Sequence, residues 1–136
     1  MKKFISLFLV LLLLITFCSC GSNSSKKYLG KWTATKIATN RTDGGNNTEI
    51  VFSDYSEKLK MELTYEFSSD NNYTVHYYIL GVEGNGYPKN GTFEIKGNKI
   101  ILEDGSGEIE NDILTIHFPD AQGRGEVIHY LTKVNE

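Results

Sequence analysis

The stretch KLKMELTYEF (58–67) carries the clearest structural signal in the chain, because apolar and polar residues alternate along its whole length. Such alternation is typical of a β-strand with one buried and one solvated face. Residues 68–72 (SSDNN) have turn chemistry, and YTVHYYIL (73–80) follows as a second stretch rich in β-branched and aromatic residues. The two stretches together predict an antiparallel hairpin.

Further strands are expected on both sides of this hairpin, at intervals of roughly ten residues. Glycines and a proline make 81–90 a loop, and Gly97-Asn98 is a two-residue hairpin turn. The strands expected after the loop cover 92–96, 99–103, a short segment around Ile109, 113–118 and 126–134. The last of them is long enough to pair with the first strand, 31–38, and so to close the sheet.

Residues 47–57 fit this pattern least well. Ile50-Val51-Phe52 reads as a strand fragment, while Asp54 has the character of a helix N-cap with Glu57 three residues later. We therefore expect a short strand followed by one helical turn. With no long helix elsewhere in the domain, the fold class is all-β: an antiparallel up-and-down meander that closes into a small barrel of about eight strands.

The same alternation predicts which side chains fill this barrel. Trp32 is expected to be buried at one end. The residues expected to share the interior are Met61, Leu63, Tyr65, Phe67, Tyr77, Phe93, Ile95, Leu114, Ile116 and Phe118.

The N-terminus predicts an exported, lipid-anchored protein. Lys2 and Lys3 precede an apolar run over 4–17, which is shorter than the about 20 residues that a membrane-spanning helix needs. The following SCG (19–21) resembles a bacterial lipobox, which implies that Cys20 receives fatty acyl chains such as palmitate and becomes the first residue after cleavage. The alternative is an uncleaved helical anchor. Both place the domain in the cell envelope, outside the cytoplasm and at a membrane.

Three regions follow from this reading. Residues 1–19 are the lipoprotein signal peptide, 20–27 a lipidated flexible tether rich in serine, and 28–136 one β-barrel domain. Removing Lys2 and Lys3 leaves 12 basic against 17 acidic residues, a net charge of about −5. That sign argues against a nucleic-acid partner.

Catalytic, metal and cofactor sites are not expected. The three histidines, His76, His117 and His129, lack the spacing of zinc ligands, and we expect them at the surface or in hydrogen bonds. The only two cysteines, Cys18 and Cys20, are lost to cleavage and acylation, which removes any thiol nucleophile from the domain. Without a nucleophile and base in a known motif, the sequence predicts a protein that is not an enzyme and has no cofactor.

A family resemblance becomes visible at the start of the first strand. Gly30-Lys31-Trp32 resembles the Gly-x-Trp of lipocalins, and the ordered hairpins that follow resemble bacterial lipocalin-like domain lipoproteins over nearly all of 28–134. In lipocalins an arginine of the last strand stacks on this tryptophan. The residue in that place here is Lys133, which lacks the planar guanidinium.

The resemblance implies a function. We expect a membrane-tethered barrel that holds a small apolar or amphipathic ligand in a shallow pocket beside the 81–90 loop, with Tyr65, Tyr77 and Phe93 as ligand-binding residues. The alternative is a protein-binding barrel that engages an envelope or secreted partner through its loops 42–48 and 81–90, a role that Tyr87 would suit if it were exposed on the second loop.

Overall fold

The computed structural model describes residues 25–56 and 58–135, so the predicted signal peptide, Cys20 and most of the predicted tether lie outside the described residues. The elements are, in chain order, β1 (Gly30–Arg41), β2 (Glu49–Val51), α2 (Phe52–Ser56), β3 (Glu62–Phe67), β4 (Asn72–Ile79), β5 (Val82–Glu83), β6 (Lys89–Lys96), β7 (Lys99–Leu102), β8 (Ser106–Glu110), β9 (Ile113–Pro119) and β10 (Gly125–Lys133). Within these residues no helix is long and apolar enough to cross a membrane.

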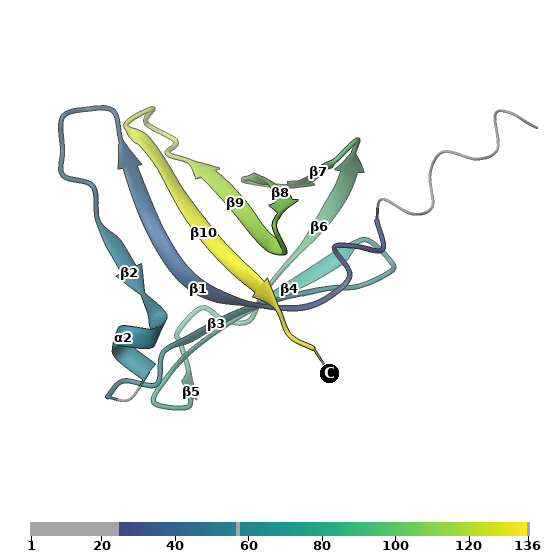
Figure 1. Ribbon diagram of the computed structural model, residues 1–136, viewed down its shortest axis with the longest axis horizontal. Coiled ribbons are helices and arrows are strands. Elements are labelled where there is room, and N and C mark those ends of the chain that lie inside the picture. Colours follow the sequence, from purple (N-terminus) through teal and green to yellow (C-terminus); the bar gives the residue numbers. More distant parts are fainter. Residues whose placement is uncertain (1–24, 57, 136) are drawn as a thin grey trace, which may run out of the picture.

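Antiparallel pairing carries the sheet around a closed circuit (Figure 1). Neighbouring strands follow the order β1, β3, β4, β6, β7, β8, β9 and β10, and β10 pairs back onto β1. In the described part of the chain, β2 pairs only with β1 and β5 only with β4, which leaves eight strands in the wall. The expected antiparallel barrel of about eight strands is confirmed.

The seam between β1 and β10 closes this barrel. Nine residue pairs join the two strands, from Trp32 opposite Lys133 to Arg41 opposite Gly125, with a register shift at Thr35. On its other edge β1 pairs with β3 near its start and with β2 further along. A bulge bends a strand and increases its twist, which suits a strand that serves both the seam and two further partners.

One end of the barrel is closed by the segment that precedes β1, on the right of Figure 1. Tyr28 is completely buried, its hydroxyl donates a hydrogen bond to the Asn98 carbonyl, and its own carbonyl accepts one from Trp32 Nε1 at 2.8 Å. Trp32 is 2 % exposed, which confirms its expected burial. Lys133 lies beside it, with Nζ 5.5 Å from the indole centroid.

The backbone conformation explains why position 30 is a glycine. Its φ of +102° is one that residues with a side chain rarely adopt, and the aliphatic stem of Lys133 passes close to the position that a Cβ would take. Gly30, Trp32 and Lys133 therefore meet at the closed end. The residues before them, from Ser25, form a hydrogen-bonded turn against this end.

The interior side chains form one cluster. Of the ten expected there, six are buried and four pack against them; the buried ones are Leu63, Tyr65, Phe67, Phe93, Leu114 and Ile116, and the others Met61, Tyr77, Ile95 and Phe118. This expectation is confirmed. The buried cluster lies wholly between Tyr28 and Leu131, so a chain that begins at Gly21 contains the complete core.

The helical turn was predicted in the right region but with the wrong start. The helix begins at Phe52, which is 6 % exposed and inserts into the core, so Asp54 lies in the first turn instead of at the N-cap. The next strand also begins later than its alternation suggests. The amides of Leu59 and Lys60 both donate to the Tyr55 carbonyl, and this turn occupies the residues before β3.

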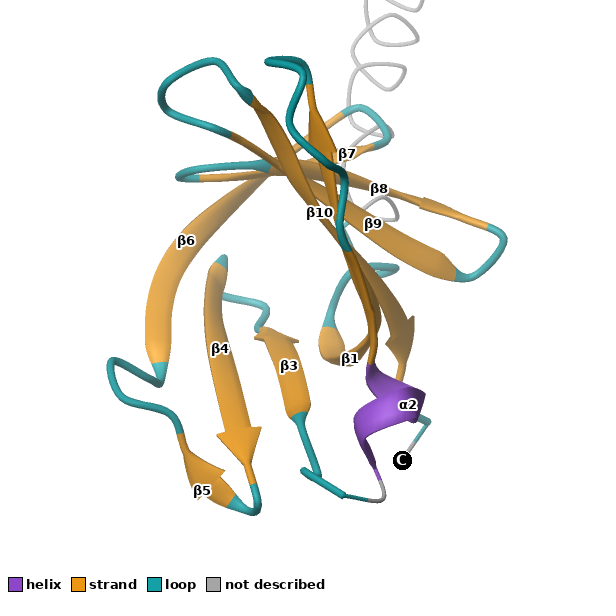
Figure 2. Ribbon diagram, turned by 90° about the vertical axis from the view of Figure 1, so that its left-hand side faces the viewer, coloured by secondary structure: helices purple, strands orange, loops and turns teal. Residues whose placement is uncertain are grey.

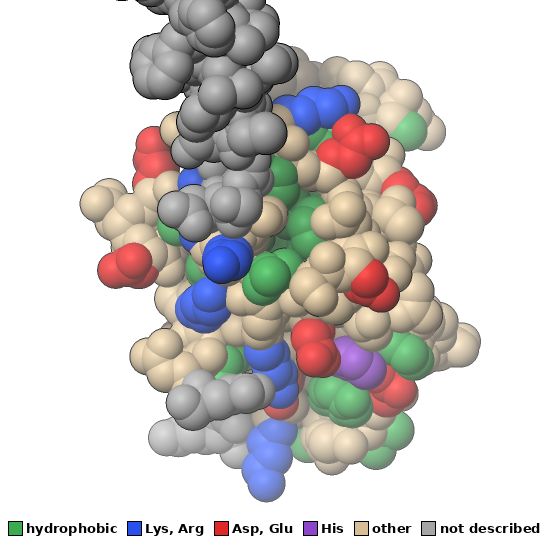
Figure 3. All heavy atoms as spheres, turned by 90° about the vertical axis from the view of Figure 1, so that its right-hand side faces the viewer, with side chains coloured by type: hydrophobic (Ala, Val, Ile, Leu, Met, Phe, Trp, Pro, Cys, Tyr) green, Lys and Arg blue, Asp and Glu red, His purple; other side chains and the backbone are tan. Residues whose placement is uncertain are grey.

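The stretch 81–90 is not entirely a loop. It contains the two-residue strand β5 and the first residues of β6, with a cis peptide bond between Tyr87 and Pro88. Figure 2 shows β3, β4 and β6 side by side in the wall, with β5 and α2 at its lower edge. On the face that carries the N-terminal segment, basic and acidic side chains are interspersed (Figure 3).

Candidate ligand-binding cavity

A cavity of about 290 Å³ lies against the inner side of the wall, beneath the connection from β5 to β6. Strands β3, β4, β6, β9 and β10 and the turn before β8 contribute to it. Its lining residues are Tyr65, Tyr73, Val75, Tyr87, Lys89, Asp104, Phe118, Val127 and His129. Lys89 and Asp104 are exposed, so the cavity communicates with solvent at the edge where these two residues lie.

Aromatic rings make up most of this wall, five of the nine lining residues including His129. The imidazole of His129 lies between two of them, 4.8 Å from the Phe118 ring and 6.0 Å from the Tyr65 ring, centroid to centroid. The Tyr87 ring also contacts the Tyr77 ring, with 5.7 Å between the two centroids. Aromatic faces of this kind offer a large apolar contact area with specific stacking geometry.

Two glycines make room for rings of this wall. A Cβ on Gly91 would lie 2.6 Å from the ring of Tyr73, its cross-strand partner, and a Cβ on Gly105 would lie 2.8 Å from the ring of Phe118. Both rings therefore pass over backbone that carries no side chain. These glycines decide where two cavity walls lie, although in the sequence they look like ordinary turn or strand glycines.

The polar centre of the cavity is the pair formed by Tyr65 and His129. The Tyr65 hydroxyl lies 2.8 Å from His129 Nδ1, which joins β3 to β10 across the barrel. Burial lowers the pKa of His129 to about 4, against a smaller opposing effect of the Asp104 charge, so the imidazole is neutral at neutral pH. Burial also raises the pKa of Tyr65, which keeps its hydroxyl protonated.

The two charged lining residues lie at the edge of the cavity. Lys89 Nζ stands 5.2 Å from the centroid of the Tyr87 ring, and in the described residues it makes no ion pair with Asp104. Their opposite charges leave the edge neutral overall, while the interior offers rings, hydroxyls and a neutral imidazole. The arrangement suits an apolar or aromatic body with a polar group.

Of the residues expected to bind ligand, the structure brings only Tyr65 into the wall. Tyr77 does not line the cavity, although its ring contacts that of Tyr87. Phe93 is 2 % exposed and packs edge-on against Phe67, with 5.3 Å between the ring centroids. Tyr87, which would suit a protein-binding loop if it were exposed, is half-buried and lines the cavity.

His129 was not recognised as a site residue. The signal was present, because alternation along β10 places it on the same face as Leu131, which is completely buried. All three histidines are hydrogen-bonded, as expected. His76 Nδ1 donates to Glu83 at 2.6 Å and His117 Nδ1 to Glu126 at 2.9 Å. The described residues hold no group of three acidic, histidine or cysteine side chains placed to bind a metal.

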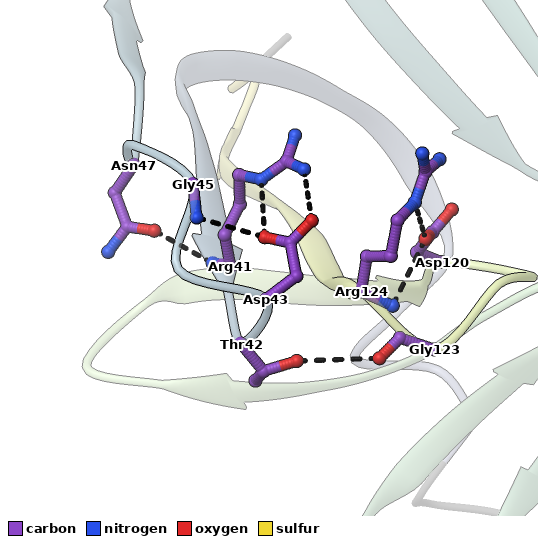
Figure 4. A network of polar contacts seen from close by, with 8 residues as sticks. All are labelled: Arg41, Thr42, Asp43, Gly45, Asn47, Asp120, Gly123 and Arg124. Carbon is purple, nitrogen blue, oxygen red and sulfur yellow. Dashed lines mark hydrogen bonds and ion pairs between the residues drawn. The ribbon is translucent and has the colours of Figure 1, made fainter.

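A separate polar network orders the loops 42–48 and 120–124 (Figure 4). Arg41 forms hydrogen bonds to Asp43, and Arg124 Nε donates to Asp120 at 2.8 Å. The bond from Arg41 is the main cause that lowers the pKa of Asp43 to about 2. Thr42 N donates to the Arg124 carbonyl at 2.9 Å and links the loops. Each guanidinium has a carboxylate partner, so we assign no anion site here.

Several solved barrels are similar to this chain at low identity. They include the siderocalin Ex-FABP (14 % identity, TM-score 0.45, 81 % of this chain and 76 % of that one), a mutant of the fluorescent protein UnaG (12 %, 0.44, 82 % and 99 %) and apo lipid binding protein 8 of Caenorhabditis elegans (11 %, 0.41, 84 % and 100 %). No curated protein sequence matches the chain. The family described as "Domain of unknown function (DUF5004)" matches residues 16–135, and the chain belongs to that family.

Proposed function

We propose that the protein is a lipid-anchored binding protein of the cell envelope whose barrel holds a small apolar or amphipathic molecule. The cavity of about 290 Å³, with rings on most sides and one neutral polar pair inside, carries this proposal. Ligand sites are typically concave, mostly apolar and equipped with a few placed polar groups.

The size of the cavity limits the ligand. A volume of about 290 Å³ lies just below the range of roughly 300 to 1,000 Å³ for drug-sized sites. A compound of one or two rings, or a short lipid fragment, suits this space.

The location outside the cytoplasm is supported by the sequence of the first 21 residues. Two or three acyl chains on Cys20 would hold the protein at a membrane, because each buried methylene contributes about 0.8 kcal/mol and a single chain binds only marginally. The tether that follows has a reach on the order of 15 Å by the scaling of flexible chains, so the barrel stays near the lipid surface.

Lipidation gives the first prediction. In its bacterial host the protein should begin at Cys20, carry acyl chains there and partition into the detergent phase. Mass spectrometry of the mature N-terminus measures this directly. Cys20→Ala should leave the protein unprocessed or released, and Cys18→Ala serves as the matched control, which should be processed normally. An intact Met1, or an unmodified Cys20, would contradict the lipoprotein assignment.

Ligand retention gives the second prediction, and it tests the function itself. The chain from Gly21, incubated with an extract of the envelope of its own host and purified again, should carry a small molecule in native mass spectra. Val127→Phe places a ring in the cavity and should reduce this adduct at least about tenfold, as expected when a contact surface is filled. Val82→Phe makes the same change at a side chain that is 70 % exposed and does not line the cavity, so it should retain the adduct.

Two results would oppose the binding proposal: an adduct of equal intensity in Val127→Phe, or none in the unsubstituted chain. The bound molecule should also be recovered with its mass unchanged after prolonged incubation, since we propose binding without chemical conversion. A change of mass that depends on the protein would indicate an enzyme instead.

Binding of a protein partner is the second candidate, and one observation favours it. Leu80 and Val82, at the turn between β4 and β5, are 60 % and 70 % exposed, and the Leu80 amide donates to the carbonyl of the 40 % exposed Leu59. Exposed apolar side chains side by side are typical of an interaction surface. A partner bound at this tip would be insensitive to Val127→Phe and sensitive to Val82→Lys, the reverse of the cavity prediction.

A further inference from the structure

The direction of the hydrogen bond between Tyr65 and His129 can be decided from their surroundings. The side chain of Tyr65 is 3 % exposed, and His129 Nδ1 is its only hydrogen-bond partner among the described residues. If the hydroxyl only accepted this bond, its own proton would be buried without an acceptor, which costs free energy. The Tyr65 O–H therefore donates to Nδ1.

The other imidazole nitrogen then carries the proton. A neutral imidazole has one N–H donor and one acceptor nitrogen, and with Nδ1 accepting, the donor is Nε2. Nε2 makes no hydrogen bond within the described part of the chain, where no buried side-chain nitrogen or oxygen lacks a partner. Nε2 is therefore accessible, and the cavity is the space that the imidazole lines.

The remaining polar groups of the cavity differ from this donor. Lys89 and Asp104 are exposed and can stay hydrated, whereas His129 is largely buried between the Tyr65 and Phe118 rings. Tyr73 and Tyr87 present hydroxyls that rotate to donate or accept. The direction of the Nε2–H bond, by contrast, is fixed, because the Tyr65 hydroxyl holds the imidazole through its other nitrogen, Nδ1.

We propose that His129 Nε2 donates a hydrogen bond to the ligand, and that the barrel therefore selects planar aromatic or conjugated molecules bearing an uncharged acceptor such as a carbonyl oxygen, an ether oxygen or a ring nitrogen. This inference rests on the proposed binding function and specifies its ligand class. The aromatic walls bind the planar rings of the ligand. The imidazole favours those ligands that carry an acceptor over ligands of equal size that lack one.

The first experiment determines the tautomer without any ligand. Nitrogen-15 NMR of the imidazoles, on the chain from Gly21 at neutral pH, should show His129 in the Nε2–H form. Tyr65→Phe removes the hydroxyl proton and should produce a mixture of both tautomers while the amide spectrum stays folded. A His129 found in the Nδ1–H form in the unsubstituted chain would overturn the inference.

The second experiment compares two probes of the same shape. 2-Acetylnaphthalene has a carbonyl oxygen where 2-isopropenylnaphthalene has a methylene, and NMR titration gives the affinity of each. The ketone should bind about fivefold to tenfold more tightly, the effect of one net hydrogen bond. His129→Phe keeps a ring in place and should abolish this preference, and Tyr65→Phe should weaken it if His129→Phe fails to fold.

The outcomes separate the two proposals. If both probes bind equally to the unsubstituted chain, the proposed selection for an acceptor group is wrong. The proposal that the barrel binds aromatic molecules would still stand. Binding of neither probe would also overturn the stated ligand class, whereas the ligand from the host envelope tests the binding function independently. A ketone preference that persists in His129→Phe would assign the donor to another residue.

Discussion

Replacing Trp32 by alanine is expected to lower the free energy of unfolding by about 3–5 kcal/mol, the usual cost of removing a large buried aromatic side chain. The indole is 2 % exposed and fills the closed end of the barrel. Its Nε1 donates to the Tyr28 carbonyl at 2.8 Å, so the substitution also leaves that carbonyl without its partner. Small domains have only about 5–15 kcal/mol in total, and the variant should lie close to global unfolding.

Urea denaturation followed by circular dichroism measures this effect, since Trp32 is the only tryptophan and the variant has no indole fluorescence. Tyr55→Ala is the control, because that aromatic side chain is 40 % exposed and should change stability by no more than about 0.5 kcal/mol. Lys133→Met should cost about 0.5–1 kcal/mol through the lost cation–π contact with the indole. A Trp32→Ala variant as stable as Tyr55→Ala would refute the role of the tryptophan in closing the barrel.

Gly125→Ala is expected to destabilise the seam of the barrel by about 2–5 kcal/mol, combining backbone strain with steric overlap. Gly125 has a φ of +138°, and a Cβ there would lie 2.1 Å from the Asn40 carbonyl oxygen and 2.8 Å from Arg41 Cα. Gly125 is also the partner of Arg41 in the last residue pair between β1 and β10. Backbone atoms cannot rotate away as a side chain can, so the overlap is relieved only if the seam opens.

Gly123→Ala provides a matched control two residues earlier. Gly123 has a φ of +70°, but no atom lies within 4 Å of the position of its Cβ. That variant should therefore show the strain alone, about 1 kcal/mol. Thermal unfolding gives the two values, and amide hydrogen exchange along β1 and β10 locates the opening. If both variants lost the same stability, the close approach at the seam would not hold in solution.

The hairpin of β3 and β4 shows what local pattern predicts well. Alternation has a period of two residues and depends only on neighbours in the chain, so the inward-facing residues were identified correctly. The first residues of 58–67 alternate as well, yet they form a turn. Phe52 is drawn into the core by distant side chains, and the helix and turn that follow it take up these residues.

The candidate site was predicted less completely than the fold. Tyr65 was recognised as an inward-facing tyrosine, and it does line the cavity. Its partner His129 lies 64 residues away in the sequence, and the two meet because β10 returns to pair with β1. Alternation along β10 indicates that His129 faces inward, but no local pattern shows that it meets Tyr65, because that contact depends on how strands far apart in the sequence are arranged.

The sequence by itself determined the strand order, the antiparallel closure and the set of inward-facing side chains, because strand pattern and turn chemistry are local properties. It also contains the N-terminal pattern from which we predict export and a lipid anchor. Only the tertiary structure decided which inward-facing residues leave a cavity between them. That depends on rings from distant strands, such as Tyr73 over Gly91 and Phe118 over Gly105, and on the space that remains once each has packed. The space left after packing depends on the side chains of all the strands together, so it cannot be predicted from any single segment of the chain.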